Sequence, residues 1–145
     1  MNWGRIDPGE LPEALLALGV RFHGHLGPFL VAGLRMGSLA LRLLKHSGYR
    51  GIEAVVETGS DPPLSCLVDG IQVASGCTVG KGNLKVVDRG RPRVIFRTGP
   101  RELVVELREG VLSRFLRAAD PEREARWALF ALEEELFRWE LSPSS

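Results

Sequence analysis

The sequence predicts an α+β protein in which a small antiparallel sheet packs against a buried central helix, with further helices on its flanks. Residues 29–45 are apolar on nearly every side of a helical projection, which is typical of a buried helix. Three short runs rich in branched apolar residues follow at hairpin-like spacing, at 84–88, 93–98 and 103–107. Because helical segments flank these strands instead of alternating with them, the α+β class is favoured.

The first third of the chain contains two predicted helices. Residues 12–18 form a short one, which Gly19 is expected to end. Pro28 suits the first position of the central helix, because proline has a preset φ and no amide hydrogen to lose. Gly33 and Gly37 lie four residues apart on this helix, so that another element can approach that face closely.

The remaining elements are predicted from local patterns. Residues 52–58 form a further strand, and residues 64–75 form a helix that ends at Gly76. A short helix covers 111–118, and a last helix covers about 120–140. The apolar stripe of that last helix consists of Leu129, Leu132, Leu136 and Trp139.

Length and composition place residues 1–145 in one globular domain. A chain of 145 residues can bury a core without disulfides, and two cysteines in a reducing compartment are expected to be free thiols or ligands. The formal net charge of +1 gives no bulk field that would attract nucleic acid or an anionic membrane. No apolar leader and no run of about 20 apolar residues is visible, so we expect a cytoplasmic protein.

Two histidines separated by one glycine form the first candidate site, at His23-Gly24-His25. In an extended segment alternate side chains point to opposite sides, so both imidazoles are not expected to serve one metal ion. The segment precedes a helix N-terminus and suits the wall of a pocket. The alternative is a pair of loop histidines that hydrogen-bond to backbone.

Cys66 and Asp69 form the second candidate site. Cys66 falls near the first turn of the predicted helix, where the helix dipole is expected to lower the thiol pKa and favour metal binding. Asp69 lies on the same face one turn later and could orient a ligand, act as a general base or favour the helix start. The alternative for Cys66 is a small buried hydrophobe.

The third candidate is the glycine-rich segment 76–83, which contains Cys77 and Lys81. It does not match the phosphate-binding loop pattern and leads from helix to strand, which excludes a nucleotide P-loop. Lys81 could still orient a small anionic substrate. A helix between Cys66 and Cys77 would hold them about 16 Å apart, too far for a disulfide or a shared metal within one chain. His25 with Cys66 is therefore the better pair.

Taken together, these segments resemble the FmdE family, which is named after a component of formylmethanofuran dehydrogenase, over about residues 18–118. The resemblance is carried by the segments 23–28, 56–58, 66–72 and 76–84. It implies an α+β core domain, commonly a homodimer, with a metal pocket made by the His-Gly-His segment and the cysteine-bearing helix. The implied ligands are His25 and Cys66, with His23 and Cys77 at further motif positions.

The chain departs from the family pattern in two places. The family usually has a cysteine where this chain has Gly27, and no cysteine follows Cys77, so the C-terminal zinc finger of many relatives is absent. Two cysteines cannot bind a four-cysteine iron–sulfur cluster, so the chain cannot be a complete formylmethanofuran dehydrogenase.

Three functions remain open at this stage. The first is a metal-binding accessory protein of one-carbon metabolism, acting with a metalloenzyme partner. Zinc is the expected metal and nickel or iron the alternatives. The second is a small metal-dependent enzyme with Asp69 as base and Lys81 as substrate-orienting group. The third is a dimeric module that binds a small ligand without turning it over.

Overall fold

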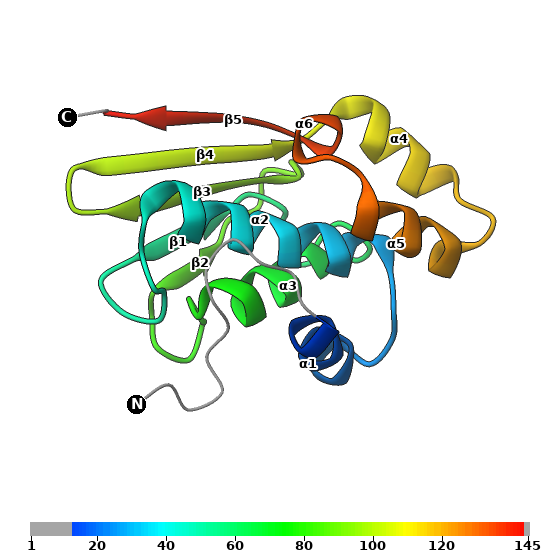
Figure 1. Ribbon diagram of the computed structural model, residues 1–145, viewed down its shortest axis with the longest axis horizontal. Helices are drawn as coiled ribbons and strands as arrows, with labels where there is room; N and C mark the ends of the chain where they lie inside the picture. The colour runs from blue at the N-terminus through cyan, green and yellow to red at the C-terminus, as the bar shows by residue number, and fades with distance from the viewer. Residues whose placement is uncertain (1–12, 144–145) are drawn as a thin grey trace.

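The computed structural model describes residues 13–143 and contains one five-stranded sheet with the order β2-β1-β3-β4-β5 (Figure 1). The strands are β1 Glu53–Val56, β2 Leu84–Val86, β3 Arg93–Thr98, β4 Arg101–Leu107 and β5 Phe137–Ser142. The helices are α1 Glu13–His23, α2 Pro28–Leu44, α3 Cys66–Ser75, α4 Glu109–Arg117, α5 Pro121–Phe130 and α6 Glu133–Leu136. The predicted α+β class is confirmed.

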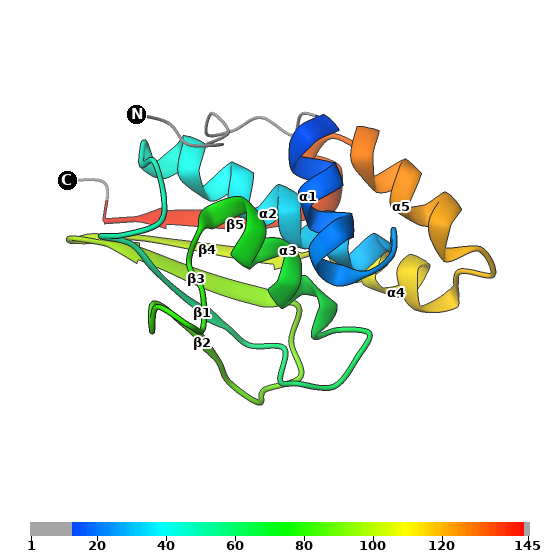
Figure 2. The same cartoon turned by 90° about the horizontal axis from the view of Figure 1, so that it is seen from below.

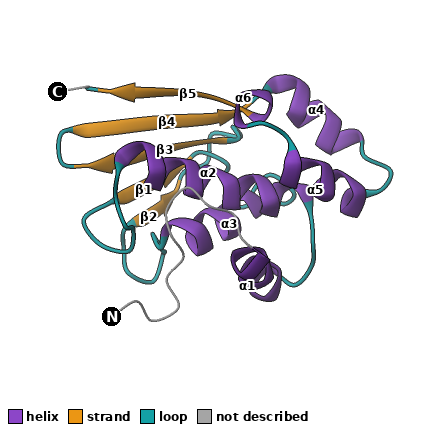
Figure 3. Ribbon diagram, viewed as in Figure 1, coloured by secondary structure: helices purple, strands orange, loops and turns teal. Residues whose placement is uncertain are grey.

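Helices α2 and α3 lie together on one face of the sheet, and α1 and α5 pack against them from outside (Figures 2 and 3). The prediction of a buried central helix is confirmed, because α2 is buried along almost its whole length and begins at Pro28. No helix among residues 13–143 combines the length and hydropathy needed to cross a bilayer.

Three glycines allow α2 and α3 to pack backbone against backbone. A Cβ atom on Gly33 would lie 2.3 Å from the carbonyl oxygen of Leu67, and one on Gly70 would lie 2.3 Å from that of Leu30. A Cβ atom on Gly37 would meet the Ala74 side chain at 2.7 Å. These separations are shorter than any real contact, so the close approach predicted at Gly33 and Gly37 is confirmed.

The sheet is mixed and not wholly antiparallel as predicted. β1 pairs with β2 in parallel, whereas the pairs β1–β3, β3–β4 and β4–β5 are antiparallel. The physical reason is the crossover between β1 and β2, which passes through α3 and returns the chain in the same direction. The spacing predicted hairpin-like connections from β2 to β3 and from β3 to β4. The strands β3 and β4 do form an antiparallel pair, whereas β1 lies between β2 and β3 in the sheet.

The sequence led us to expect that the first helix ends at Gly19, but the helix continues through this residue. A Cβ atom on Gly19 would lie 2.8 Å from the Cδ1 atom of Leu34 on α2. Gly19 is therefore a packing position inside α1, which ends at His23. This extension carries the helix to the first histidine of the candidate site.

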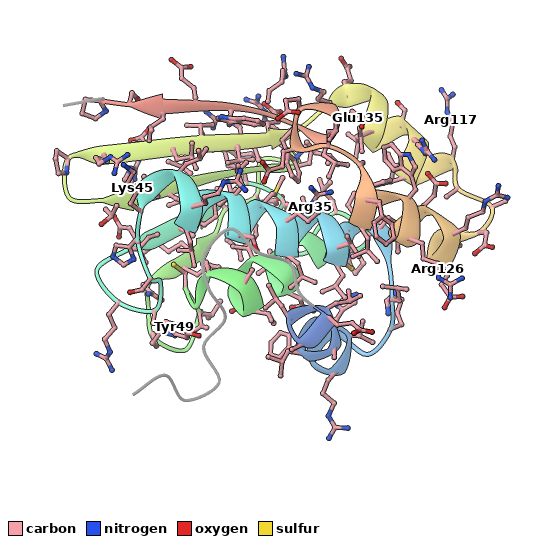
Figure 4. The ribbon with its side chains drawn as sticks, viewed as in Figure 1. Arg35, Lys45, Tyr49, Arg117, Arg126 and Glu135 are labelled. Carbon is pink, nitrogen blue, oxygen red and sulfur yellow. The ribbon has the colours of Figure 1, made fainter. Side chains whose placement is uncertain are left out.

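The predicted C-terminal helix at 120–140 is wrong beyond Phe130. The α5 helix ends there, and the backbone of Ala131 and Leu132 is extended. The guanidinium of Arg35 on α2 (Figure 4) donates a hydrogen bond of 2.8 Å to the carbonyl of Ala128, near the end of α5. The following residues form α6 and then β5, which pairs along the whole of β4. From Phe137 onward, the side chains on β5 alternate between more buried and exposed positions. Pairing with β4 therefore determines the structure of this segment, despite the helical spacing of its apolar residues.

Candidate functional site

The ends of five helices surround a pocket of about 310 Å³. The pocket lies where α1 ends, where α2 and α3 begin, and where the chain passes from α4 to α5. The residues that line it are His23, His25, Gly27, Pro28, Phe29, Leu30, Pro63, Cys66, Phe115, Leu116, Ala118 and Pro121. Both histidines and one cysteine of the predicted site therefore share one cavity.

His23 and His25 lie side by side, contrary to the expectation that they point to opposite sides. Their ring centroids are 4.6 Å apart, with the ring planes inclined by 36°. The reason is that His23 ends α1 and Gly24 has a φ of +106°, a conformation that residues with a side chain rarely adopt. The chain reverses at Gly24 and brings both imidazoles to the same pocket.

The imidazole of His23 is held by Asp69. The His23 Nδ1 and Asp69 Oδ2 atoms are 2.6 Å apart, and the His23 side chain is only 9% exposed. A carboxylate can only accept, so Nδ1–H donates the hydrogen bond and a neutral ring keeps its free lone pair on Nε2. Histidine ligands of metal ions are commonly oriented in this way by a carboxylate behind them. The arrangement is consistent with the ligand-orienting role considered for Asp69.

Cys66 is the first residue of α3 and lines the pocket, but its thiol is not activated as predicted. Burial raises the pKa of the Cys66 thiol, and the nearby Asp69 carboxylate raises it further. Both effects oppose the one expected from the helix start, so the prediction of a lowered pKa is wrong. In the absence of a cation Cys66 is a protonated thiol at neutral pH, and a bound metal ion would have to displace its proton.

Gly27 lies close against the second histidine. A Cβ atom on Gly27 would lie 3.1 Å from the Nε2 atom of His25. A cysteine at this position, as expected from the family pattern, would therefore require the His25 ring to shift by a few tenths of an ångström. The replacement by glycine removes one candidate ligand at the point where His25 faces the pocket.

Cys77 and Lys81 lie at the other end of α3 and do not line the pocket. Cys77 is fully buried, and its Sγ atom is 3.7 Å from the Ile52 carbonyl oxygen. Burial raises the pKa of the Cys77 thiol, with opposing contributions from Ser75 and Lys81. The Lys81 Nζ atom donates to Thr78 Oγ1 at 3.2 Å. α3 spans about 15 Å at 1.5 Å per residue, so the structure does not bring these two side chains together with Cys66.

The donor types in the pocket suit zinc, but the described residues do not supply a full set. Among residues 13–143, no group of three or more His, Cys, Asp or Glu side chains is arranged to hold a metal ion. A structural zinc site takes four protein ligands and a catalytic one takes three. His23, His25 and Cys66 could hold a metal only with side-chain adjustment, and water or a donor from elsewhere would have to complete the set.

The apolar wall of the pocket was missed from sequence. Phe115, Leu116, Ala118 and Pro121 come from the end of α4 and the start of α5, far along the chain from the histidines. The only signal was the amphipathic pattern of 109–117, which indicates a covering helix but not what it covers.

Comparison with known proteins agrees with this fold. Residues 22–139 match the family model described as "FmdE, Molybdenum formylmethanofuran dehydrogenase operon". The fold resembles the crystal structure of an FmdE-like protein of the tungsten formylmethanofuran dehydrogenase type from Syntrophus aciditrophicus, with a TM-score of 0.63 and 21% identity. That match covers 92% of this chain and 72% of the other.

A curated relative is more similar over a shorter stretch. The chain is 36% identical over 91 residues to a "Probable S-adenosyl-L-methionine-binding protein" from Archaeoglobus fulgidus. The match covers 59% of this chain but only 24% of that protein, so the chain spans about a quarter of the relative's length.

The fold and the pocket define an α+β domain with a histidine- and cysteine-lined cavity between helix ends. The chain belongs to the FmdE family, since the family model covers most of its length. The match extends past residue 118, where the sequence resemblance was expected to end, and takes in α5, α6 and the first half of β5.

Proposed function

We propose that the chain binds a divalent metal ion, with zinc as the expected ion and nickel or iron as alternatives, in the pocket formed by His23, His25 and Cys66. The observation that carries the proposal is the 2.6 Å contact between His23 Nδ1 and Asp69 Oδ2. In a neutral His23 ring this contact leaves the lone pair of Nε2 available to coordinate a metal ion. The second imidazole and a thiol lie in the same cavity. When bound, the metal would supply Lewis acidity, and Asp69 would keep the His23 ring in one orientation.

The proposed setting is an accessory role in the cytoplasm, beside a metalloenzyme of the formylmethanofuran dehydrogenase type. Membership of the FmdE family supports this setting. A homodimer is part of the proposal, because a second copy of the chain or water is needed to complete a ligand set that one chain's described residues leave short. Whether the bound metal is used for catalysis depends on whether a coordination position stays open.

A second candidate is a module that binds a small organic ligand in the same pocket. It is favoured by the apolar side chains on the far wall, which a structural metal site does not need. The relative from Archaeoglobus fulgidus carries a name that refers to S-adenosyl-L-methionine. Since the chain spans about a quarter of that protein, the name does not by itself assign this ligand to the chain.

The test is metal titration of tag-free protein, followed by elemental analysis after gel filtration at a known protein concentration. We expect about one metal per chain or per dimer in the parent, with binding lost in His23→Ala and in Cys66→Ser. Lys81→Ala is the matched control, since Lys81 lies outside the pocket, and it should bind like the parent. A parent that takes up no zinc, nickel or iron would refute the metal proposal and leave the small-ligand module.

A further inference from the structure

The metal proposal does not account for most of the pocket's surface. Of the twelve lining residues, only His23, His25 and Cys66 offer side-chain donors, and the others are glycine or apolar. The volume of about 310 Å³ is far larger than a metal ion needs and lies at the small end of the range of about 300–1,000 Å³ for ligand pockets. The pocket therefore has room for an organic molecule beside the histidines.

The apolar wall is held firmly in place by aromatic packing. Phe115 meets Phe29 edge to face at 5.3 Å between ring centroids, and Trp127 meets Phe115 from behind at 6.4 Å. Phe29 and Phe115 are each at most 5% exposed, so both rings are fixed parts of the core that also face the cavity. A wall of this kind is formed before any ligand arrives.

Leu116 stands out at the rim of this wall. It lines the pocket and is 57% exposed, which leaves much of a large apolar side chain in water. A ligand with an apolar body would cover Leu116 and remove that surface from water.

Charge restricts what the ligand can be. None of the twelve lining residues is Lys, Arg, Asp or Glu, and the carboxylate that contacts His23, that of Asp69, is hydrogen-bonded to it. The lysine that the sequence offered for an anionic substrate, Lys81, lies at the far end of α3. A charged group entering the pocket would lose hydration and find no lysine, arginine, aspartate or glutamate side chain among the lining residues.

We propose that the pocket binds a small uncharged molecule, with an apolar body against Phe29, Phe115 and Leu116 and one polar group directed at His23, His25 and Cys66. This deepens the proposed function by naming the ligand class of the same pocket. It does not require the metal, because the apolar wall and the lack of charge are properties of the protein alone.

The test uses three probes of one shape and different charge: benzyl alcohol, benzoate and benzylammonium. Binding is followed by chemical shift changes in 15N-labelled protein that has been freed of metal with EDTA, at neutral pH. We expect benzyl alcohol to shift the amide signals of Leu116 and Ala118 in a saturable way, with at least tenfold weaker binding of both charged probes. Equal or tighter binding of benzoate or benzylammonium would overturn the proposal.

Two variants separate the pocket from the rest of the surface. Leu116→Glu places a charge on the rim without disturbing the core and should weaken benzyl alcohol binding at least tenfold. Leu132→Glu is the matched control, because Leu132 is 62% exposed and lies outside the pocket. Unchanged binding in Leu116→Glu would overturn the proposal. Since metal is absent throughout, failure of the metal titration and failure of this test can be told apart.

Discussion

The two ends of α3 each have a cysteine but have very different structures. Each end has a cysteine, Cys66 at the start and Cys77 just past the end, and each is associated with a glycine-rich segment. At the start, Gly24 reverses the chain and leaves two imidazoles and a thiol around an open cavity. At the end, Cys77 is fully buried.

Side-chain acceptors occupy several backbone amides in the segment after α3. In the segment after α3, the N–H groups of Thr78, Val79 and Lys81 are bonded to the side chains of Asn83, Gln72 and Thr78. The backbone donors that could have bound an anion are thus already satisfied within the protein. Glycine and cysteine content does not distinguish a binding site from a closed loop, but the access of the side chains to a cavity does, since Cys66 lines the pocket and Cys77 is fully buried.

The largest loss of stability is expected from disrupting the packing of α3 against α2. Gly70→Val would place side-chain atoms against the α2 backbone at Leu30, where even a Cβ atom would lie at 2.3 Å. We expect a loss of about 3 kcal/mol or more in the free energy of unfolding, measured by urea titration. The control is Gly110→Ala in α4, where a Cβ atom would meet nothing within 4 Å. In this variant the free energy of unfolding should stay the same or rise. A stable Gly70→Val variant would contradict the backbone-to-backbone packing.

Serine substitution at the two cysteines should separate a packing role from a pocket role. Cys77→Ser introduces a hydroxyl at a position with 0% exposure and should lower the free energy of unfolding by about 1–3 kcal/mol. Cys66→Ser, at a partly exposed position, should cost less than about 1 kcal/mol. Equal losses for the two variants would mean that Cys66 also serves mainly as a packing residue.

Removal of the carboxylate that contacts His23 should weaken zinc binding in the pocket without abolishing it. Asp69→Asn keeps the shape but loses the charge that orients the His23 ring. We expect zinc affinity to fall about 10- to 100-fold, the usual effect of removing such a partner. Competition with a chromophoric chelator measures the affinity, and Asp88→Asn at an exposed position is the control. An unchanged affinity would show that His23 is not a ligand.

The role of the glycine between the histidines can be tested by alanine substitution. Both Gly24 and Gly82 have positive φ, +106° and +78°, and at neither would a Cβ atom meet anything within 4 Å. Gly24→Ala and Gly82→Ala should therefore cost similar strain, about 1–3 kcal/mol each. Only Gly24→Ala should also reduce zinc uptake, as measured by titration. Reduced uptake in both variants would point to a general loss of folding instead.

The smallest effect concerns the pH dependence of thiol reactivity in metal-free protein. A raised pKa means that the Cys66 thiol stays protonated to higher pH than a free cysteine. Alkylation by iodoacetamide requires the thiolate, so its rate should be low at pH 7 and rise only above the pH at which a free cysteine model reacts. Cys77, being fully buried, should react only in urea. Fast labelling of Cys66 at pH 7 would contradict the raised pKa.

Sequence patterns predicted the centre of the fold well and its ends less well. The buried α2 helix, the α3 helix and strand β3 follow from local periodicity and turn residues, which act over short distances. The parallel pairing of β1 with β2 and the strand β5 depend on partners far along the chain. For β5, a stripe of leucines at helical spacing was outweighed by pairing with β4, a contact that no local pattern reports.

The candidate site could be predicted in its residue types but not in its arrangement. His23, His25 and Cys66 were identified as pocket residues, and the structure brings them together. The hydrogen bond from His23 to Asp69 links positions 46 residues apart and could not be read from spacing. The apolar wall and the raised pKa of Cys66 depend on burial by α4 and its neighbours, which is a tertiary property.

The most direct test of the central claim is the absorption spectrum of the protein loaded with Co²⁺, which reports sulfur-to-cobalt charge transfer when a thiolate is bound. We predict a charge-transfer band in the parent and in Cys77→Ser, and its loss in Cys66→Ser. A band that survives in Cys66→Ser and disappears in Cys77→Ser would contradict the assignment of the metal site to the pocket at the start of α3.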